Sequence, residues 1–127
     1  IILLQATSPL RDDIDIFNAI NLYKRERRSL VLSVKKVNNI YIKYGYKNKR
    51  EFIPFHKNFI FKNRQDLPEV FSPNGAIYIF SVNDFLKDNK IPDDNIGFYE
   101  MSNENSIDID DENDLNKVKG ILKIRNK

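Results

Sequence analysis

The sequence predicts an α/β fold with a mostly parallel sheet, because two short apolar segments flank one helical segment near its beginning. Residues 1–4 form a continuous apolar run, which is typical of a strand buried on both faces. Residues 12–28 carry apolar side chains at helical spacing and end in a basic cluster that suits the helix dipole. Residues 29–34 are apolar and β-branched, which predicts a second buried strand. Such a strand–helix–strand unit is expected to be right-handed, with its two strands parallel.

Composition limits the function classes. The chain has 127 residues, of which 41% are apolar and 31% are charged, as in a globular domain with one core. It has no cysteine, which excludes disulfides and thiolate chemistry, and its single histidine, His56, cannot form a histidine cluster. The formal charge of +3 is too small to indicate nucleic acid as a partner. No apolar run approaches membrane-spanning length and no basic segment precedes the first apolar run, so we expect a cytoplasmic protein without a membrane partner.

The first residue already lies inside an apolar run, without a polar approach. We therefore expect the chain to be the rear part of a larger domain.

Residues 35–72 differ from the rest and are expected to form a protruding β-rich arm. Aromatic side chains alternate there with basic residues and asparagines, without a helical period. They could stack bases of a nucleic acid or form one face of a subunit interface. We favour the interface, and hence a homodimer, because the sequence has no glycine-flanked aromatic motif of an RNA-binding module.

The later segments return to the pattern of a core. Residues 67–75 predict a loop, and Gly75 would let its backbone approach a ligand closely. A strand is expected at 76–80, a short helix at 81–86 capped by Ser81 or Asn83, and a strand at 96–101. A closing helix is expected after residue 110, with acidic residues at its start and basic residues at its end.

Two aspartates, Asp108 and Asp110, occupy alternate positions of an apolar segment directly before this last helix. If the segment is extended, both carboxylates lie on one face while Ile107 and Ile109 are buried on the other. Such a pair suits Mg²⁺, which takes its remaining ligands from water and substrate phosphates. The alternative is that the aspartates cap the following helix. These residues alone leave both interpretations open.

Three motifs occur together in order: LQATSPLR at 4–11, PNGAIYI at 73–79, and SIDID at 106–110 followed by Asp114 and Leu115. Their order and spacing resemble the acylneuraminate cytidylyltransferases, the CMP-sialic acid synthetases that join CTP to a nine-carbon sugar acid. The resemblance covers nearly the whole chain. It implies a partial three-layer, Rossmann-like nucleotidyltransferase domain of a dimeric enzyme that serves polysaccharide biosynthesis.

The resemblance also assigns roles to individual residues. Asp108 and Asp110 match the family's Mg²⁺ site, which holds the CTP phosphates. Gln5 matches a glutamine that contacts the sugar acid. Lys43 aligns with a lysine that reaches the sugar pocket, often from the partner subunit. Asn74 and Gly75 match part of the wall of the sugar site. No residue is expected to act as a covalent nucleophile.

The sequence also departs from the family pattern. It contains four glycines and no Gly-rich phosphate loop, so the chain alone is expected to bind CTP poorly and to turn over little. Ser72 stands where some sialic acid enzymes have an arginine, so legionaminic or pseudaminic acid is as good a candidate as sialic acid. Two other functions stay open: a CMP-Kdo-type sugar nucleotidyltransferase, and a non-catalytic truncated module that dimerises through the arm.

Overall fold

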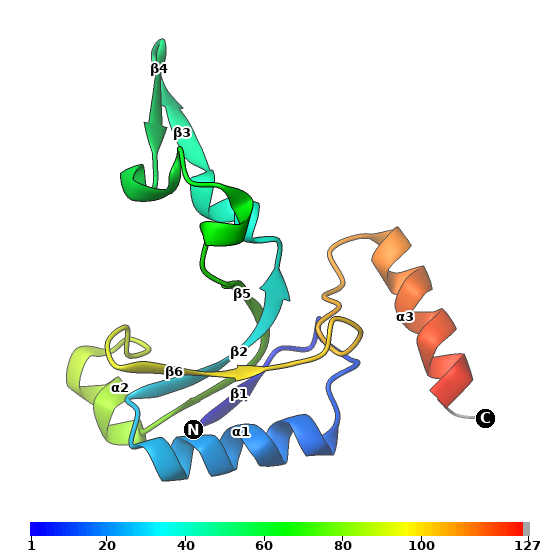
Figure 1. Cartoon of the computed structure of the whole chain (residues 1–127). Coiled ribbons are helices and arrows are strands. Elements are labelled where there is room, and N and C mark those ends of the chain that lie inside the picture. The colour runs from blue at the N-terminus through cyan, green and yellow to red at the C-terminus, as the bar shows by residue number, and fades with distance from the viewer. Residues whose placement is uncertain (126–127) are drawn as a thin grey trace. The chain divides into compact units, whose positions relative to one another are not determined.

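The computed structural model describes residues 1–125, which separate into two compact units (Figure 1). The first unit combines residues 1–35 with the chain from Pro73 onward, and the second is the intervening segment Lys36–Ser72. The second unit nearly coincides with the range predicted for the arm. Each unit is described by itself below.

A four-stranded sheet organises the first unit, in the order β1-β5-β2-β6. Its strands are β1 (Ile2–Leu4), β2 (Leu30–Val37), β5 (Val70–Phe80) and β6 (Ile96–Glu100). Strand β1 pairs antiparallel with β5, whereas β2 pairs parallel with β6. The α/β class is therefore confirmed, but the sheet is mixed rather than mostly parallel. The reason is that β5 lies between β1 and β2, so the two strands of the predicted crossover unit are not neighbours.

Strand β1 is less buried than its apolar sequence predicted. Its residues Ile2, Leu3 and Leu4 are 38–45% exposed. In the described sheet β1 is an edge strand with β5 as its only neighbour. The prediction of burial on both faces was wrong because hydrophobicity alone cannot tell an edge position from a central one.

Helix α1 (Asp13–Glu26) packs its apolar side against the inner strands of the sheet. It begins with a capping box, in which the Asp12 carboxylate accepts a hydrogen bond from the Asp15 N–H and the Asp15 carboxylate accepts one from the Asp12 N–H. Ala19 is fully buried, and it joins Val31 and Ile77 in the core. The predicted helix start is confirmed.

The remaining helices also follow the sequence pattern. Helix α2 (Val82–Asp88) is capped by Ser81, whose hydroxyl accepts a hydrogen bond from the Asp84 N–H. Helix α3 (Glu112–Arg125) closes the described chain. No helix within residues 1–125 is both long and apolar enough to cross a membrane.

The loop predicted at 67–75 is largely absent, because β5 runs without interruption from Val70 to Phe80. Gly75 lies inside this strand with φ of +76°, a left-handed conformation that glycine adopts without strain. The Pro-Asn-Gly sequence therefore marks an irregularity within a strand rather than a turn between elements.

The second unit contains a two-stranded antiparallel hairpin of β3 (Gly45–Asn48) and β4 (Glu51–Pro54). Short 3₁₀ turns flank it: η1 (Asn39–Lys43), η2 (Lys57–Phe59) and η3 (Arg64–Asp66). The predicted hairpin is confirmed. Its large aromatic side chains are mostly exposed, and Phe61 reaches 95% exposure.

Candidate functional site

The loop that follows β1 is folded back on itself by Arg11. One guanidinium nitrogen of Arg11 donates to the carbonyl oxygens of Gln5 at 2.6 Å and Ser8 at 2.9 Å. The same nitrogen lies 3.3 Å from the carbonyl oxygen of Ala76 in β5. Arg11 thereby holds the Gln5–Arg11 motif against the strand that carries Asn74 and Gly75.

Gln5 lies directly over Gly75. A Cβ atom built on Gly75 would stand 2.4 Å from Oε1 of Gln5, closer than any real side-chain contact allows. A side chain at position 75 would therefore have to displace the flexible end of Gln5, and the positive φ of Gly75 favours glycine independently. Gln5 and Gly75, which the family resemblance assigned to the sugar site and which lie 70 positions apart along the chain, are thus in contact.

Asn74, by contrast, is buried in the protein, with 6% of its surface exposed. Its Oδ1 accepts hydrogen bonds from the Ser33 hydroxyl at 2.5 Å and the Ala76 N–H at 3.2 Å. Its Nδ2 donates to the Ser106 hydroxyl at 2.9 Å and lies 3.4 Å from the Met101 sulfur. Asn74 thus links β2 and β5 to the segment that leads into the two aspartates.

The Asp108 and Asp110 segment is not a regular strand, in contrast to the expectation. Two contacts hold it to the loop after β1: the Ser8 hydroxyl donates to Oδ1 of Asp108 at 3.1 Å, and the Ile109 N–H donates to the Thr7 carbonyl at 2.9 Å. Asp108 is half-buried and Asp110 is exposed, while the flanking isoleucines are only half-buried. The buried anchor of this segment is therefore Ser106 rather than the isoleucines.

The next aspartate, Asp111, provides the helix cap. Its carboxylate accepts a hydrogen bond from the Asp114 N–H at 2.9 Å at the start of α3. A hydrogen bond from Lys117, together with the N–H groups of Asp110 and Asp111, holds the pKa of Asp114 below its usual value. The side chains of Asp108 and Asp110 are thus not needed for this cap.

The residues present fit a magnesium ion of the kind that substrate phosphates complete. Carboxylate oxygens are the protein ligands that Mg²⁺ prefers, and one or two of them suffice when phosphates and waters supply the rest. Asp108, which lies against the loop after β1, and the exposed Asp110 therefore remain the predicted magnesium ligands. Among residues 1–125, no three His, Cys, Asp or Glu side chains are grouped so as to hold a metal ion by themselves.

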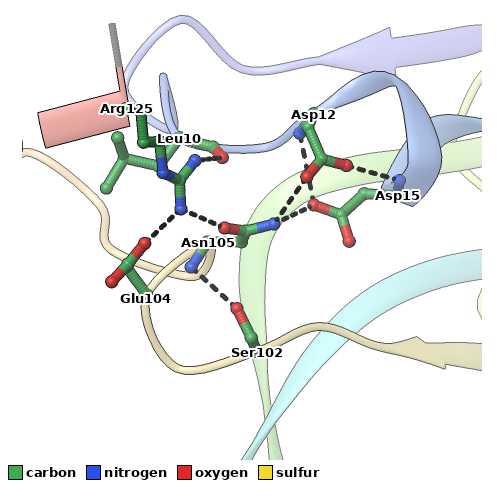
Figure 2. Close-up of polar contacts among 7 residues, drawn as sticks. All are labelled: Leu10, Asp12, Asp15, Ser102, Glu104, Asn105 and Arg125. Atoms are coloured by element: carbon green, nitrogen blue, oxygen red, sulfur yellow. Dashed lines mark hydrogen bonds and ion pairs between the residues drawn. The ribbon is translucent and has the colours of Figure 1, made fainter. Parts of the chain in front are cut away.

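A second polar network ties the end of α3 to the start of α1 (Figure 2). Arg125 donates to the Leu10 carbonyl at 3.0 Å and to Oδ1 of Asn105 at 2.6 Å, and it pairs with Glu104. The Asn105 amide group in turn donates to the carboxylates of Asp12 and Asp15. Asn105 thus anchors the chain before Asp108 and Asp110 to the start of α1. Arg125 anchors the end of α3, which follows them, to Leu10.

Tyr99 of β6 extends this network from the sheet. Its hydroxyl donates to Oδ1 of Asp15 at 3.1 Å. Burial raises the pKa of Tyr99 above its usual value, so the hydroxyl keeps the proton that it donates.

Lys43 belongs to the second unit, whereas the other predicted site residues belong to the first. Its Nζ donates to the Lys62 carbonyl at 2.5 Å, and its side chain is half-buried. The structure leaves its predicted contact with the sugar pocket as a prediction.

Four residues that support the site were not predicted from the sequence: Ser8, Arg11, Ser33 and Ser106. Ser8 and Arg11 lie within the LQATSPLR motif, but their chemistry gives no sign of which backbone groups they meet. Ser33 interrupts an apolar strand, and a polar residue at such a position signals a buried hydrogen bond.

Comparison with known proteins extends along almost the whole chain, although no family model matches it. The post-translational flagellin modification protein B of Campylobacter coli is 27% identical over 124 residues, which cover 97% of this chain and 52% of that protein. The N-acylneuraminate cytidylyltransferase of Streptococcus agalactiae serotype III is 30% identical over 125 residues, covering 95% of this chain and 30% of that protein. The serotype V enzyme is 31% identical over 127 residues, with the same coverage. The chain is a relative of the acylneuraminate cytidylyltransferases.

The resemblance predicted from the three motifs is thereby confirmed. The chain spans about half the length of the flagellin modification protein and less than a third of the streptococcal cytidylyltransferases. In this chain, all three motifs meet in the first unit, at the loop after β1.

Proposed function

We propose that this chain is part of an Mg²⁺-dependent enzyme that transfers CMP from CTP to a nonulosonic, sialic-acid-like sugar acid and releases pyrophosphate. The observation that carries the proposal is the contact of Gln5 with Gly75. Gln5 lies in the same loop as Ser8, whose hydroxyl donates to Asp108. These contacts bring together three motifs that are far apart in the sequence. The similarity to N-acylneuraminate cytidylyltransferases supplies the reaction class.

The proposed reaction requires positioning and charge neutralisation more than covalent chemistry. A hydroxyl oxygen of the sugar gives up its proton to water and attacks the α-phosphorus of CTP, the bond from that phosphorus to the oxygen bridging the β-phosphate breaks, and pyrophosphate leaves. Mg²⁺ held by Asp108 and Asp110 would neutralise the charge on the phosphate oxygens. The Gln5 amide, held over Gly75, is suited to donate to and accept from the polar groups of a sugar acid.

The wider proposal includes the fold and the assembly of the enzyme. The first unit would be part of a three-layer, Rossmann-like domain, and the second unit would be an arm that pairs two copies. Lys43 on that arm would reach a sugar pocket. The enzyme would act in the cytoplasm, where CTP is available.

Pyrophosphate release from CTP tests this function directly, in the full natural gene product that contains this chain. The sugar panel contains sialic, legionaminic and pseudaminic acids and the eight-carbon acid Kdo. We expect turnover with one nine-carbon acid, and we expect Asp110→Ala to reduce kcat by at least about 100-fold through the loss of metal-held charge neutralisation. The isolated 127-residue chain is expected to show little turnover.

Asp111→Ala is the matched control, because it removes the neighbouring carboxylate that caps α3 instead of the proposed metal ligand. It should retain most of the activity. Turnover with Kdo alone would replace the substrate with the eight-carbon acid. A folded dimer that releases no pyrophosphate with any sugar would overturn the enzymatic proposal in favour of a non-catalytic module.

A further inference from the structure

The hydrogen-bonding capacity of Asn74 is fully used inside the protein. An asparagine amide has two donor hydrogens and an oxygen that accepts two hydrogen bonds. Ser33 and the Ala76 N–H occupy the oxygen, and Ser106 and the Met101 sulfur occupy the nitrogen. The Ala76 N–H can only donate, so it determines which end of the amide is the oxygen. No group of this side chain remains to bind a sugar.

The partners of Asn74 come from separate parts of the first unit. Ser33 lies on β2 and also accepts a hydrogen bond from the Ile77 N–H at 2.8 Å. Ser106 lies two residues before Asp108 and is 1% exposed. Burial makes these bonds costly to break, because a buried polar group that loses its partner has no water to replace it.

The neighbours of Asn74 connect this network to the proposed site on both sides. Gly75, next in sequence, contacts Gln5. Beyond Ser106, Asp108 and Ile109 are bonded to Ser8 and Thr7, which follow Gln5 in the same loop. These contacts form a closed ring. It runs from Gln5 through Gly75 and Asn74 to Ser106, and it returns through Asp108 to Ser8 in the loop that contains Gln5.

We infer that Asn74 is a positioning residue that fixes the Asp108 and Asp110 segment relative to Gln5 and Gly75, and that it does not contact the sugar. This inference rests on the proposed function for the role of the two aspartates. It assigns the same positioning role to Ser106, to which the family resemblance gave no role.

Amide hydrogen exchange of Ile109 tests the inference without requiring turnover. The Ile109 N–H is bonded to Thr7 and reports whether the segment stays in place. We expect Asn74→Ala and Ser106→Ala each to increase its exchange rate by about tenfold, which corresponds to one lost buried hydrogen bond. Because Asn74→Ala leaves the larger gap and can prevent folding, Ser106→Ala is the primary variant.

Ser81→Ala is the matched control. It removes the cap of α2 and lowers global stability without touching the network. Ile109 should exchange more slowly in Ser81→Ala than in Ser106→Ala. Equal rates in the two variants would show exchange through global unfolding, and unchanged rates in Ser106→Ala would show that the segment does not depend on Asn74. Either result overturns the inference.

Titration with Mn²⁺, followed by broadening of the amide signals of Asp108 and Asp110, separates this inference from the proposed function. We expect Ser106→Ala to raise the Mn²⁺ dissociation constant by about tenfold, the lower end of the effect of an outer-shell partner. In the double variant, Ser106→Ala should add little to the effect of Asn74→Ala, because Asn74→Ala already breaks the Asn74–Ser106 bond. Independent, additive effects would contradict the shared bond. If Asp110→Ala leaves Mn²⁺ binding unchanged, the metal site fails, while the exchange rates still decide the role of Asn74.

Discussion

Gln5 and Gly75 meet so closely that the identity of one residue limits the other. The backbone of Gly75 has φ of +76°, where a side chain costs about 1–2 kcal/mol by collision with its own backbone. Oε1 of Gln5 then occupies the space where a Cβ would lie. The backbone penalty belongs to Gly75 alone, whereas the collision with Oε1 depends on Gln5. Substitutions at the two positions can therefore separate the backbone penalty from the collision.

Gly75→Ala should lower the free energy of unfolding by about 2 kcal/mol in the wild-type chain and by about 1 kcal/mol in a Gln5→Ala background. The smaller cost is expected because removal of the Gln5 side chain leaves only the backbone penalty. Urea unfolding of the four chains measures both values. An equal cost in the two backgrounds would mean that Gln5 does not lie over Gly75 in solution.

The start of α3 separates two aspartates that the sequence alone could not distinguish. Asp111 accepts the N–H of Asp114, as a helix cap does, whereas Asp110 is exposed one residue earlier. The ion pair of Asp114 with Lys117 supports the same first turn. The cap and the proposed metal ligand are thus adjacent residues with separate roles.

Asp111→Ala should lower the free energy of unfolding by about 1 kcal/mol, because the first turn of α3 loses the partner of one N–H group. Asp110→Ala should change it by less than about 0.5 kcal/mol, as for an ordinary surface residue. Thermal unfolding in the absence of divalent metal compares the two. The reverse order would return Asp110 to the role of helix cap.

At the scale of the whole molecule, the second unit carries large aromatic side chains that are mostly exposed. Tyr46, Phe52 and Phe55 of the hairpin region are each more than half exposed, and Phe61 is almost fully exposed. Aromatic residues are enriched where protein surfaces associate. These side chains support the proposed pairing of two copies through the arm.

The double variant Phe52→Ser with Phe61→Ser should raise the dissociation constant of the homodimer by at least about 100-fold, since each buried aromatic contact contributes more than about 1.4 kcal/mol. Sedimentation of the full chain over a concentration series measures this constant. Phe17→Ser is the matched control, because Phe17 on α1 is 63% exposed and lies outside the arm. A wild-type monomer at micromolar concentration, or an equal effect of Phe17→Ser, would contradict pairing through the arm.

Local patterns in the sequence determined the elements of this protein. The apolar spacing and the Asp12 cap were sufficient to predict α1, and Ser81 was sufficient to begin α2, because these signals act within a few residues. The three motifs likewise sufficed to identify the family. Local chemistry singled out Gly75, Asp108 and Asp110 as candidates, and the resemblance added Gln5.

Only the tertiary structure decided which of these elements are neighbours. It placed β5 between β1 and β2, left β1 at an edge, and turned the expected loop at Gly75 into part of a long strand. It also enclosed Asn74 among Ser33, Ala76, Met101 and Ser106, which come from separate segments of the first unit. The physical reason is that burial and hydrogen-bond satisfaction depend on partners from other segments, and such partners are not encoded in the spacing of any single segment.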